Sequence, residues 1–197
     1  MSGLDPALFP PKPARMHEAC GPGAAAFAAV LAAQLDGPVL WVLESWRADM
    51  LTPQGLSAFF DPARLLIARA KDQTEVLAVT EEALRGKTLS LVVAELARPI
   101  GLTPGRRLQL AAGEGRTLGL CLIADGAGSN AAETRWHCAP VFDADPGIGD
   151  STPMRWEIIK NKSGTLGAWH VRWEHATRRL HVVSPAGERP GSQGAAG

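Results

Sequence analysis

The sequence lacks the long hydrophobic runs of a membrane protein. None of its apolar stretches approaches the ~20 residues that a membrane-spanning helix needs. The N-terminus also lacks a basic segment followed by a hydrophobic one and a cleavage site. We therefore expect a cytoplasmic protein that makes no membrane contact.

Cysteine is scarce, and this argues against a disulfide framework and against a zinc site. The three cysteines, Cys20, Cys121 and Cys138, are odd in number, far apart and set among apolar neighbours, so we expect small core residues. The five histidines show no ligand spacing with Cys, Asp or Glu. No catalytic residue, metal or cofactor is predicted, and the chain is not expected to be an enzyme.

The chain also has no excess of charge of either sign. Its 20 basic residues balance its 20 acidic ones, whereas a protein that holds duplex DNA by itself usually carries a basic excess. We expect weak or indirect DNA contact. The balance is uneven, because the segment from Ser151 to Ser184 holds six basic residues against two acidic ones, which suits an acidic partner.

What is present is an alternation of strand-like and helix-like segments. With 197 residues, 46% of them apolar, the chain suits one domain with one core. Strands are predicted at 15–20, 39–43, 64–68, 89–96 and 117–124, and helices at 24–35, 52–60, 72–86 and 103–113. The run at 39–43 is apolar throughout, and the run at 64–68 is apolar after Arg64, which is typical of strands covered on both faces. The pattern predicts an α/β fold with a mainly parallel central sheet flanked by helices.

Beyond Asp125 the pattern changes to strands alone. They are predicted at 133–141, 154–161, 168–174 and 179–184. Trp169, Val171 and Trp173 alternate with polar residues, as in a strand with one buried face. We expect an antiparallel or mixed C-terminal extension of the sheet, in which the tryptophans are core or interface anchors rather than platforms for bases.

The two ends lack periodic apolar positions. Residues 1–14 carry prolines at 6, 10, 11 and 13, which predicts a flexible lead-in. Residues 185–197 are rich in glycine, alanine and proline and are predicted to be a disordered tail. The folded domain is expected to span 15–184.

The first strand–helix turn stands where a phosphate-binding loop would be. Such a loop reads G-x-x-x-x-G-K-[ST], because the lysine reaches the terminal phosphates and the hydroxyl holds magnesium. Here the turn is Gly21-Pro22-Gly23, and Ala26 and Phe27 stand where the lysine and the hydroxyl belong. A weak anion site on backbone N–H groups is the alternative to a purely structural turn, which we favour.

The strand at 89–96 stands where a metal-supporting aspartate would follow. It offers only Glu95, which we interpret as a helix cap or solvent contact rather than a metal ligand. The loop from Asp125 to Asn130 is short and has no further charge, so it does not match a long DNA-gripping loop.

The stretch Trp156-Glu157-Ile158-Ile159-Lys160-Asn161-Lys162, followed by Ser163-Gly164, resembles the RecA core. There a strand ends in Lys-Asn-Lys, and the lysines approach the nucleotide of the neighbouring subunit. The resemblance covers roughly 15–184. It implies a RecA-like domain with a degenerate nucleotide site, and makes Lys160, Asn161 and Lys162 the candidate protein interface.

Within that superfamily the glycine turn and the Lys-Asn-Lys segment look most like the ImuA family. That resemblance implies a non-catalytic adaptor in SOS-induced, error-prone translesion DNA synthesis. The implied partners are RecA, ImuB (a Y-family-like protein) and, through ImuB, an error-prone DNA polymerase. Two alternatives stay open: a SulA-like inhibitor of cell division, and a RecA-like protein that binds ATP weakly.

Overall fold

Nine strands form one continuous sheet in the computed structural model, which describes residues 9–47, 51–142, 153–162 and 164–185. The strand order is β3-β2-β4-β5-β1-β6-β7-β8-β9. The strands are β1 (Met16–Cys20), β2 (Val39–Glu44), β3 (Leu65–Ala70), β4 (Leu91–Glu95), β5 (Leu118–Leu122), β6 (Thr134–Pro140), β7 (Pro153–Asn161), β8 (Gly167–Glu174) and β9 (Arg179–Pro185).

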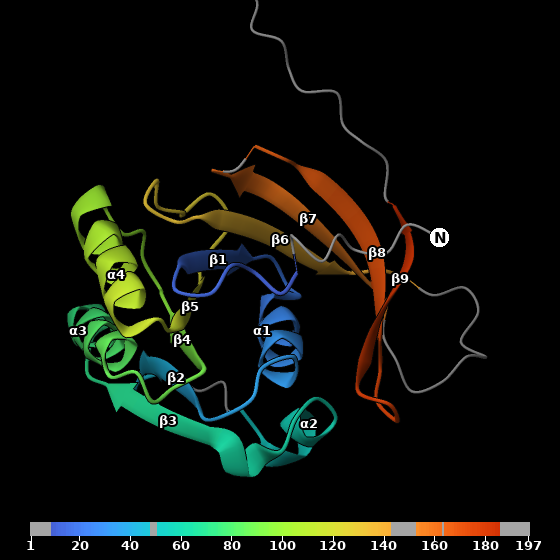
Figure 1. Ribbon diagram of the computed structural model, residues 1–197, viewed down its shortest axis with the longest axis horizontal. Helices are drawn as coiled ribbons and strands as arrows, with labels where there is room; N and C mark the ends of the chain where they lie inside the picture. The colour runs from blue at the N-terminus through green and yellow to red at the C-terminus, as the bar shows by residue number, and fades with distance from the viewer. Residues whose placement is uncertain (1–8, 48–50, 143–152, 163, 186–197) are drawn as a thin grey trace, which may run out of the picture.

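The sheet has a parallel part and an antiparallel part. Every neighbouring pair from β3 through to β6 is parallel, whereas β6–β7, β7–β8 and β8–β9 are antiparallel. Figure 1 shows the antiparallel strands curving away from the helical half of the molecule. The predicted α/β class with an antiparallel C-terminal extension is confirmed.

Helices cover both faces of the parallel part. Helix α1 (Ala24–Ala33) lies on one face, and α3 (Gln73–Arg85) and α4 (Leu102–Gly115) lie on the other (Figure 1). The short α2 (Pro53–Ser57) and a single 3-10 turn (Pro62–Arg64) precede β3. Within the described ranges, none of the helices is both long and apolar enough to cross a bilayer.

Helix α1 is the most deeply buried helix of the described chain. Seven of its ten residues are buried, and six of those seven are alanine, valine or leucine on positions all around the helix. Small side chains let the helix approach the sheet closely, and such all-round burial is typical of a central core helix. Its Phe27 packs against Trp136 and Trp156, as expected for tryptophans that anchor a core.

The three cysteines are core residues, as the sequence predicts. Cys20, Cys121 and Cys138 are all buried and none forms a disulfide. Burial raises the pKa of the Cys20 thiol to about 12, so the thiol stays neutral and unreactive at physiological pH.

Strand β3 differs from the expectation of a strand covered on both faces. It lies at the edge of the sheet, and Leu66 and Ile67 are 52% and 46% exposed. A continuous apolar run does not distinguish a central strand from an edge strand, because strand order depends on contacts far apart in the sequence. The prediction that 64–68 is fully buried is wrong.

The ordered core begins before the predicted start of the domain at residue 15. Phe9 is buried, and its ring lies 5.7 Å from Phe27 and 5.1 Å from Trp156. The segment from 9 to 14 therefore adds to the core instead of serving only as a lead-in. The rest of the predicted lead-in, 1–8, and nearly all of the predicted tail, 186–197, lie outside the described residues.

Candidate functional site

The glycine turn lies at the carboxyl edge of the parallel strands. It follows β1 directly, and the ends of β2, β4 and β5 lie beside it. A cavity of about 930 Å³ opens here, bounded by Gly21, Pro22, Arg47, Glu95 and Leu122 among others. Open α/β sheets bind ligands at this edge, so this is the place to test for a nucleotide site.

The backbone of the turn is already bonded within the protein. The Gly23 N–H donates to the Cys138 carbonyl at 2.8 Å, and the Ala24 N–H donates to the Gly21 carbonyl at 3.1 Å. Pro22 has no N–H. These are two of the groups that could cradle a phosphate at a helix start. Here the Gly23 N–H holds the turn against β6, and the Ala24 N–H closes the turn itself.

The two glycines allow the backbone of the turn to pack closely against β6. Gly21 has a φ of +85°, and a Cβ on it would lie 2.5 Å from the Cys138 carbonyl oxygen. A Cβ on Gly23 would lie 3.0 Å from the Cys138 carbonyl carbon. The turn is therefore glycine-rich for packing, in line with the structural interpretation of Gly21-Pro22-Gly23.

The position of the magnesium-holding hydroxyl is filled by an aromatic core. The ring of Phe27 is fully buried, with its centroid 5.2 Å from that of Trp136 and 4.8 Å from that of Trp156. Ala26 lines a small apolar pocket together with Met154. Neither side chain offers an ammonium group or a hydroxyl to a phosphate.

Glu95 is engaged by neighbouring side chains. Its Oε1 accepts a hydrogen bond from Trp41 Nε1 at 2.7 Å, and its Oε2 lies 2.9 Å from Arg47 Nε. Both carboxylate oxygens thus have protein partners, which favours a structural role over metal support. The same ion pair balances the charge of Arg47, the guanidinium that borders the cavity.

The Lys-Asn-Lys segment lies away from the glycine turn. Asn161 pairs with Thr134 at the start of β6, whereas the turn contacts Cys138 four residues further on, about 13 Å along the strand. The structure therefore does not bring the two predicted sites together within this chain.

Both lysines of the segment bind backbone carbonyls of the loop before β6. Lys160 Nζ donates to Asn130 O at 3.1 Å and also to Ala132 O, and Lys162 Nζ donates to Ala131 O at 2.7 Å. Burial, then the nearby charge of Lys162, lowers the pKa of Lys160. The lysines thus hold the end of this loop, and the side chain of Asn161 bonds Thr165 O at 2.8 Å.

A buried ion pair that sequence reasoning missed holds the same loop. Glu18 Oε2 lies 2.8 Å from Arg135 Nε, and Glu18 Oε1 accepts from the Ser129 N–H at 2.7 Å. A Cβ on Gly128 would lie 1.9 Å from the Arg135 guanidinium, so only glycine lets that group pass. The available signal was a carboxylate in the middle of a strand, flanked by His17 and Ala19, ahead of an apolar helix.

A second buried group, His17, is held as the neutral ring. Its Nε2 donates to Lys12 O at 2.9 Å, and its Nδ1 faces Thr134 Oγ1 at 2.7 Å. Trp136 Nε1 donates to the same hydroxyl at 2.9 Å, so the hydroxyl proton points to Nδ1. If Nδ1 were protonated, its N–H and the Thr134 hydroxyl would both be donors facing each other. Burial also disfavours the charged ring and lowers the pKa of His17 to about 4.

Acidification is therefore expected to destabilise the fold through His17. The folded pKa lies below the unfolded value, so the unfolded state takes up the proton first. The stabilisation is full above about pH 6.5 and is lost towards pH 4, by roughly 3 kcal/mol. Urea unfolding followed by tryptophan fluorescence at about pH 7 and about pH 4.5 measures it.

The variant His17→Gln should weaken this pH dependence. His181→Gln is the matched control, because the side chain of His181 is 54% exposed. If the pH slope in His17→Gln equals that of the wild type, His17 is not its source.

Comparison with known proteins identifies relatives of this chain. The chain is 33% identical over 162 residues to Protein ImuA of two strains of Caulobacter vibrioides, NA1000 / CB15N and ATCC 19089 / CIP 103742 / CB 15. The match covers 74% of this chain and 64% of each relative. The chain is an ImuA homologue. The resemblance to the ImuA family is confirmed, and the chain spans somewhat less than two thirds of the length of these relatives.

The fold of this ImuA homologue is RecA-like. The RadB recombinase matches with a TM-score of 0.62 over 88% of this chain and 92% of that one, at 12% identity. At that identity the likeness shows the fold alone. No protein-family model matches the chain.

Proposed function

We propose that the chain is a non-catalytic RecA-like adaptor in SOS-induced, error-prone translesion DNA synthesis. It binds RecA and ImuB and, through ImuB, an error-prone DNA polymerase. The observation that carries the proposal is the state of the glycine turn. Its N–H groups at Gly23 and Ala24 are bonded within the protein, and Phe27 fills the hydroxyl position with an aromatic ring.

The chemistry of the cavity supports a role without ATP hydrolysis. A triphosphate needs a cation and a magnesium ligand beside the turn. The guanidinium at the rim, Arg47, is paired with Glu95, and that carboxylate would repel phosphate. The homology to ImuA supports the pathway, and the fold supports the RecA-like part of the proposal.

Two surfaces are suited to protein partners. The outer edge of β3 leaves a row of backbone groups without a strand neighbour in the described chain, beside the exposed Leu66 and Ile67. Such an edge is a template for an added strand. The second surface is the Lys-Asn-Lys segment, where Lys162 is exposed although its ammonium group bonds the loop.

Interferometry with the immobilised chain tests the proposal. Purified ImuB and RecA are expected to bind, and addition of ATP and magnesium should change the affinity for ImuB by less than about twofold. Ile67→Lys probes the edge of β3, and Lys162→Gln probes the Lys-Asn-Lys segment. A substitution on the surface that binds a partner should weaken capture of that partner about tenfold. Lys160 is left intact because its replacement would release three loop carbonyls.

Lys87→Gln serves as the control, since Lys87 is exposed and belongs to neither surface. Failure to capture either partner would overturn the adaptor role. Micromolar affinity for ATP in a calorimetric titration would instead establish the ATP-binding alternative.

A further inference from the structure

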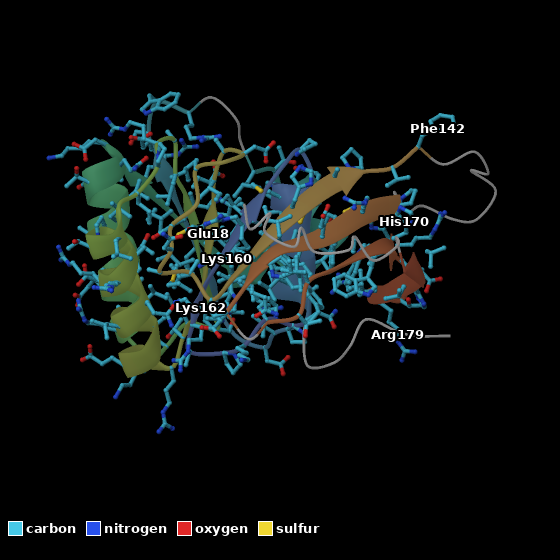
Figure 2. All side chains as sticks on the ribbon, turned by 90° about the horizontal axis from the view of Figure 1, so that it is seen from above. Glu18, Phe142, Lys160, Lys162, His170 and Arg179 are labelled. Atoms are coloured by element: carbon cyan, nitrogen blue, oxygen red, sulfur yellow. The ribbon has the colours of Figure 1, made fainter. Side chains whose placement is uncertain are left out.

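Helix α4 lies at the periphery of the molecule and presents one row of side chains to solvent (Figure 1). It packs against α3 and, less extensively, against β1 and β5. Figure 2, in which α4 is the yellow-green helix, shows its side chains extending away from the sheet. The row consists of Leu102, Arg106, Leu110 and Gly113, whose spacing of three or four residues places them on one helix face. We call this row the outer ridge of α4.

The outer ridge exposes two leucines. Leu102 is 45% exposed and Leu110 is 70% exposed. They stand about 12 Å apart along the helix axis, with Arg106 midway between them. The solvent-facing side of a surface helix is usually charged or polar. Two leucines around one arginine therefore indicate a surface that a partner can cover.

The basic groups of the outer ridge have no carboxylate beside them. Arg106 is exposed and makes no hydrogen bond or ion pair with any residue of the described chain. One turn beyond Leu110, the guanidinium of Arg15 lies beside Gly113, since a Cβ on Gly113 would be 3.8 Å from Arg15 Nη1. Arg15 Nη1 donates to the Ala14 carbonyl at 3.0 Å and not to a carboxylate. Two positive charges thus flank Leu110 without a counter-charge from the described chain.

The neighbouring row of α4, by contrast, is neutralised by α3. Arg107 Nη2 lies 2.7 Å from Glu81 Oε2, and Glu114 Oε2 lies 3.1 Å from Arg85 Nε. Helix α4 therefore has counter-charges where it packs on α3. They are missing on the outer ridge, so the unbalanced charge of the helix is concentrated there.

A helix that carries leucines and carboxylates is the partner that fits this ridge. The backbone groups within α4 are bonded along the helix, so an added strand would have no edge to pair with. A ridge of one helix packs instead into a groove of another. A second copy of the chain fits poorly, because antiparallel pairing of Leu102 with Leu110 would bring Arg106 against its own counterpart. Carboxylates between the leucines of the partner would pair with Arg106 instead.

We propose that the outer ridge of α4 docks an amphipathic helix of a protein partner, with leucines at i and i+7 and carboxylates at i+3 and i+4. The leucines pack against Leu102 and Leu110, and the carboxylates meet Arg106 and Arg15. The contact rests on the exposure and charge of α4, whereas its biological setting rests on the adaptor role proposed above.

Fluorescence anisotropy of a labelled helical peptide with this spacing, and alanine elsewhere, tests the docking when the full chain is titrated in. The wild type is expected to bind it saturably, more weakly as salt rises, and to ignore a scrambled peptide of the same composition. Leu110→Gln and Arg106→Glu should each weaken binding about tenfold. A peptide with lysine in place of glutamate should bind Arg106→Glu more tightly than it binds the wild type.

Leu66→Gln and Arg69→Glu are the matched controls. Leu66 is 52% exposed and Arg69 is also exposed, and both lie on β3 instead of α4. Neither substitution should change the affinity for the peptide by more than about twofold. Circular dichroism of all four variants checks that the fold is retained.

Three results would overturn the proposal: no saturable binding by the wild type, equal binding of the scrambled peptide, or equal weakening by the controls. Dimerisation of the chain alone that Leu110→Gln abolishes, measured by sedimentation, would overturn it in favour of a second copy. Tighter binding of labelled oligothymidylate than of the peptide would overturn it in favour of a single-stranded nucleic acid. Capture of ImuB and RecA by a chain that does not bind the peptide would exclude this surface and leave the adaptor role standing.

Discussion

Replacing Phe27 with alanine is expected to lower the free energy of unfolding by about 3–5 kcal/mol. The ring is fully buried among Phe9, Trp136 and Trp156, so its removal leaves a cavity that rigid aromatic neighbours fill poorly. Urea unfolding followed by tryptophan fluorescence gives the change directly, with an unaltered slope if the unfolded state is unchanged.

Phe142→Ala is the matched control, because Phe142 is 91% exposed and its loss should cost no more than about 0.5 kcal/mol. An equal cost at the two positions would contradict the view that Phe27 is a core anchor. The result bears on function as well, because it would show that the position of the magnesium-holding hydroxyl is used for core packing.

Replacing Glu18 with glutamine is expected to cost about 3 kcal/mol or more. The substitution keeps the shape but leaves the Arg135 guanidinium, which is mostly buried, without its counter-charge. The same change frees the Ser129 N–H from a carboxylate, so its hydrogen exchange should quicken together with that of the loop around it. Urea unfolding and hydrogen exchange followed by NMR measure the two effects.

Glu114→Gln is the control for this prediction. Glu114 also pairs with an arginine, Arg85, but its side chain is 64% exposed, so the loss should stay below about 1 kcal/mol. In the double variant Glu18→Leu/Arg135→Met most of the stability should return, because no unpaired charge remains. If the double variant is no more stable than Glu18→Gln, the buried charge is not the source of the cost.

The order of strands and helices could be predicted from the sequence because local signals mark it. Apolar runs of strand length alternate with stretches of helical spacing, and glycine or proline separates them at 21–23 and 36–38. Helix α3 is a clear case, since Asp72 Oδ1 accepts from the Glu75 N–H at 3.0 Å, as its capping pattern predicts. Helix α4 begins at Leu102, one residue before the predicted start.

The candidate site could be predicted from the sequence only where the identity of a single residue decides its chemistry. The absence of a lysine and a hydroxyl after the turn is visible in the sequence at Ala26 and Phe27. The contacts of Lys160 with the loop carbonyls are not visible there, because about 30 residues separate the partners. The Glu18–Arg135 pair spans 117 positions, and only the fold brings it together.

The bond from Gly23 to the Cys138 carbonyl has a consequence for how such a protein can change over generations. Restoring a phosphate site would require the turn to leave β6, a cation to replace Ala26 and a hydroxyl to replace Phe27. The first and the third of these steps loosen the core before any nucleotide contact offsets the loss. A phosphate site at this turn is thus out of reach of any single substitution.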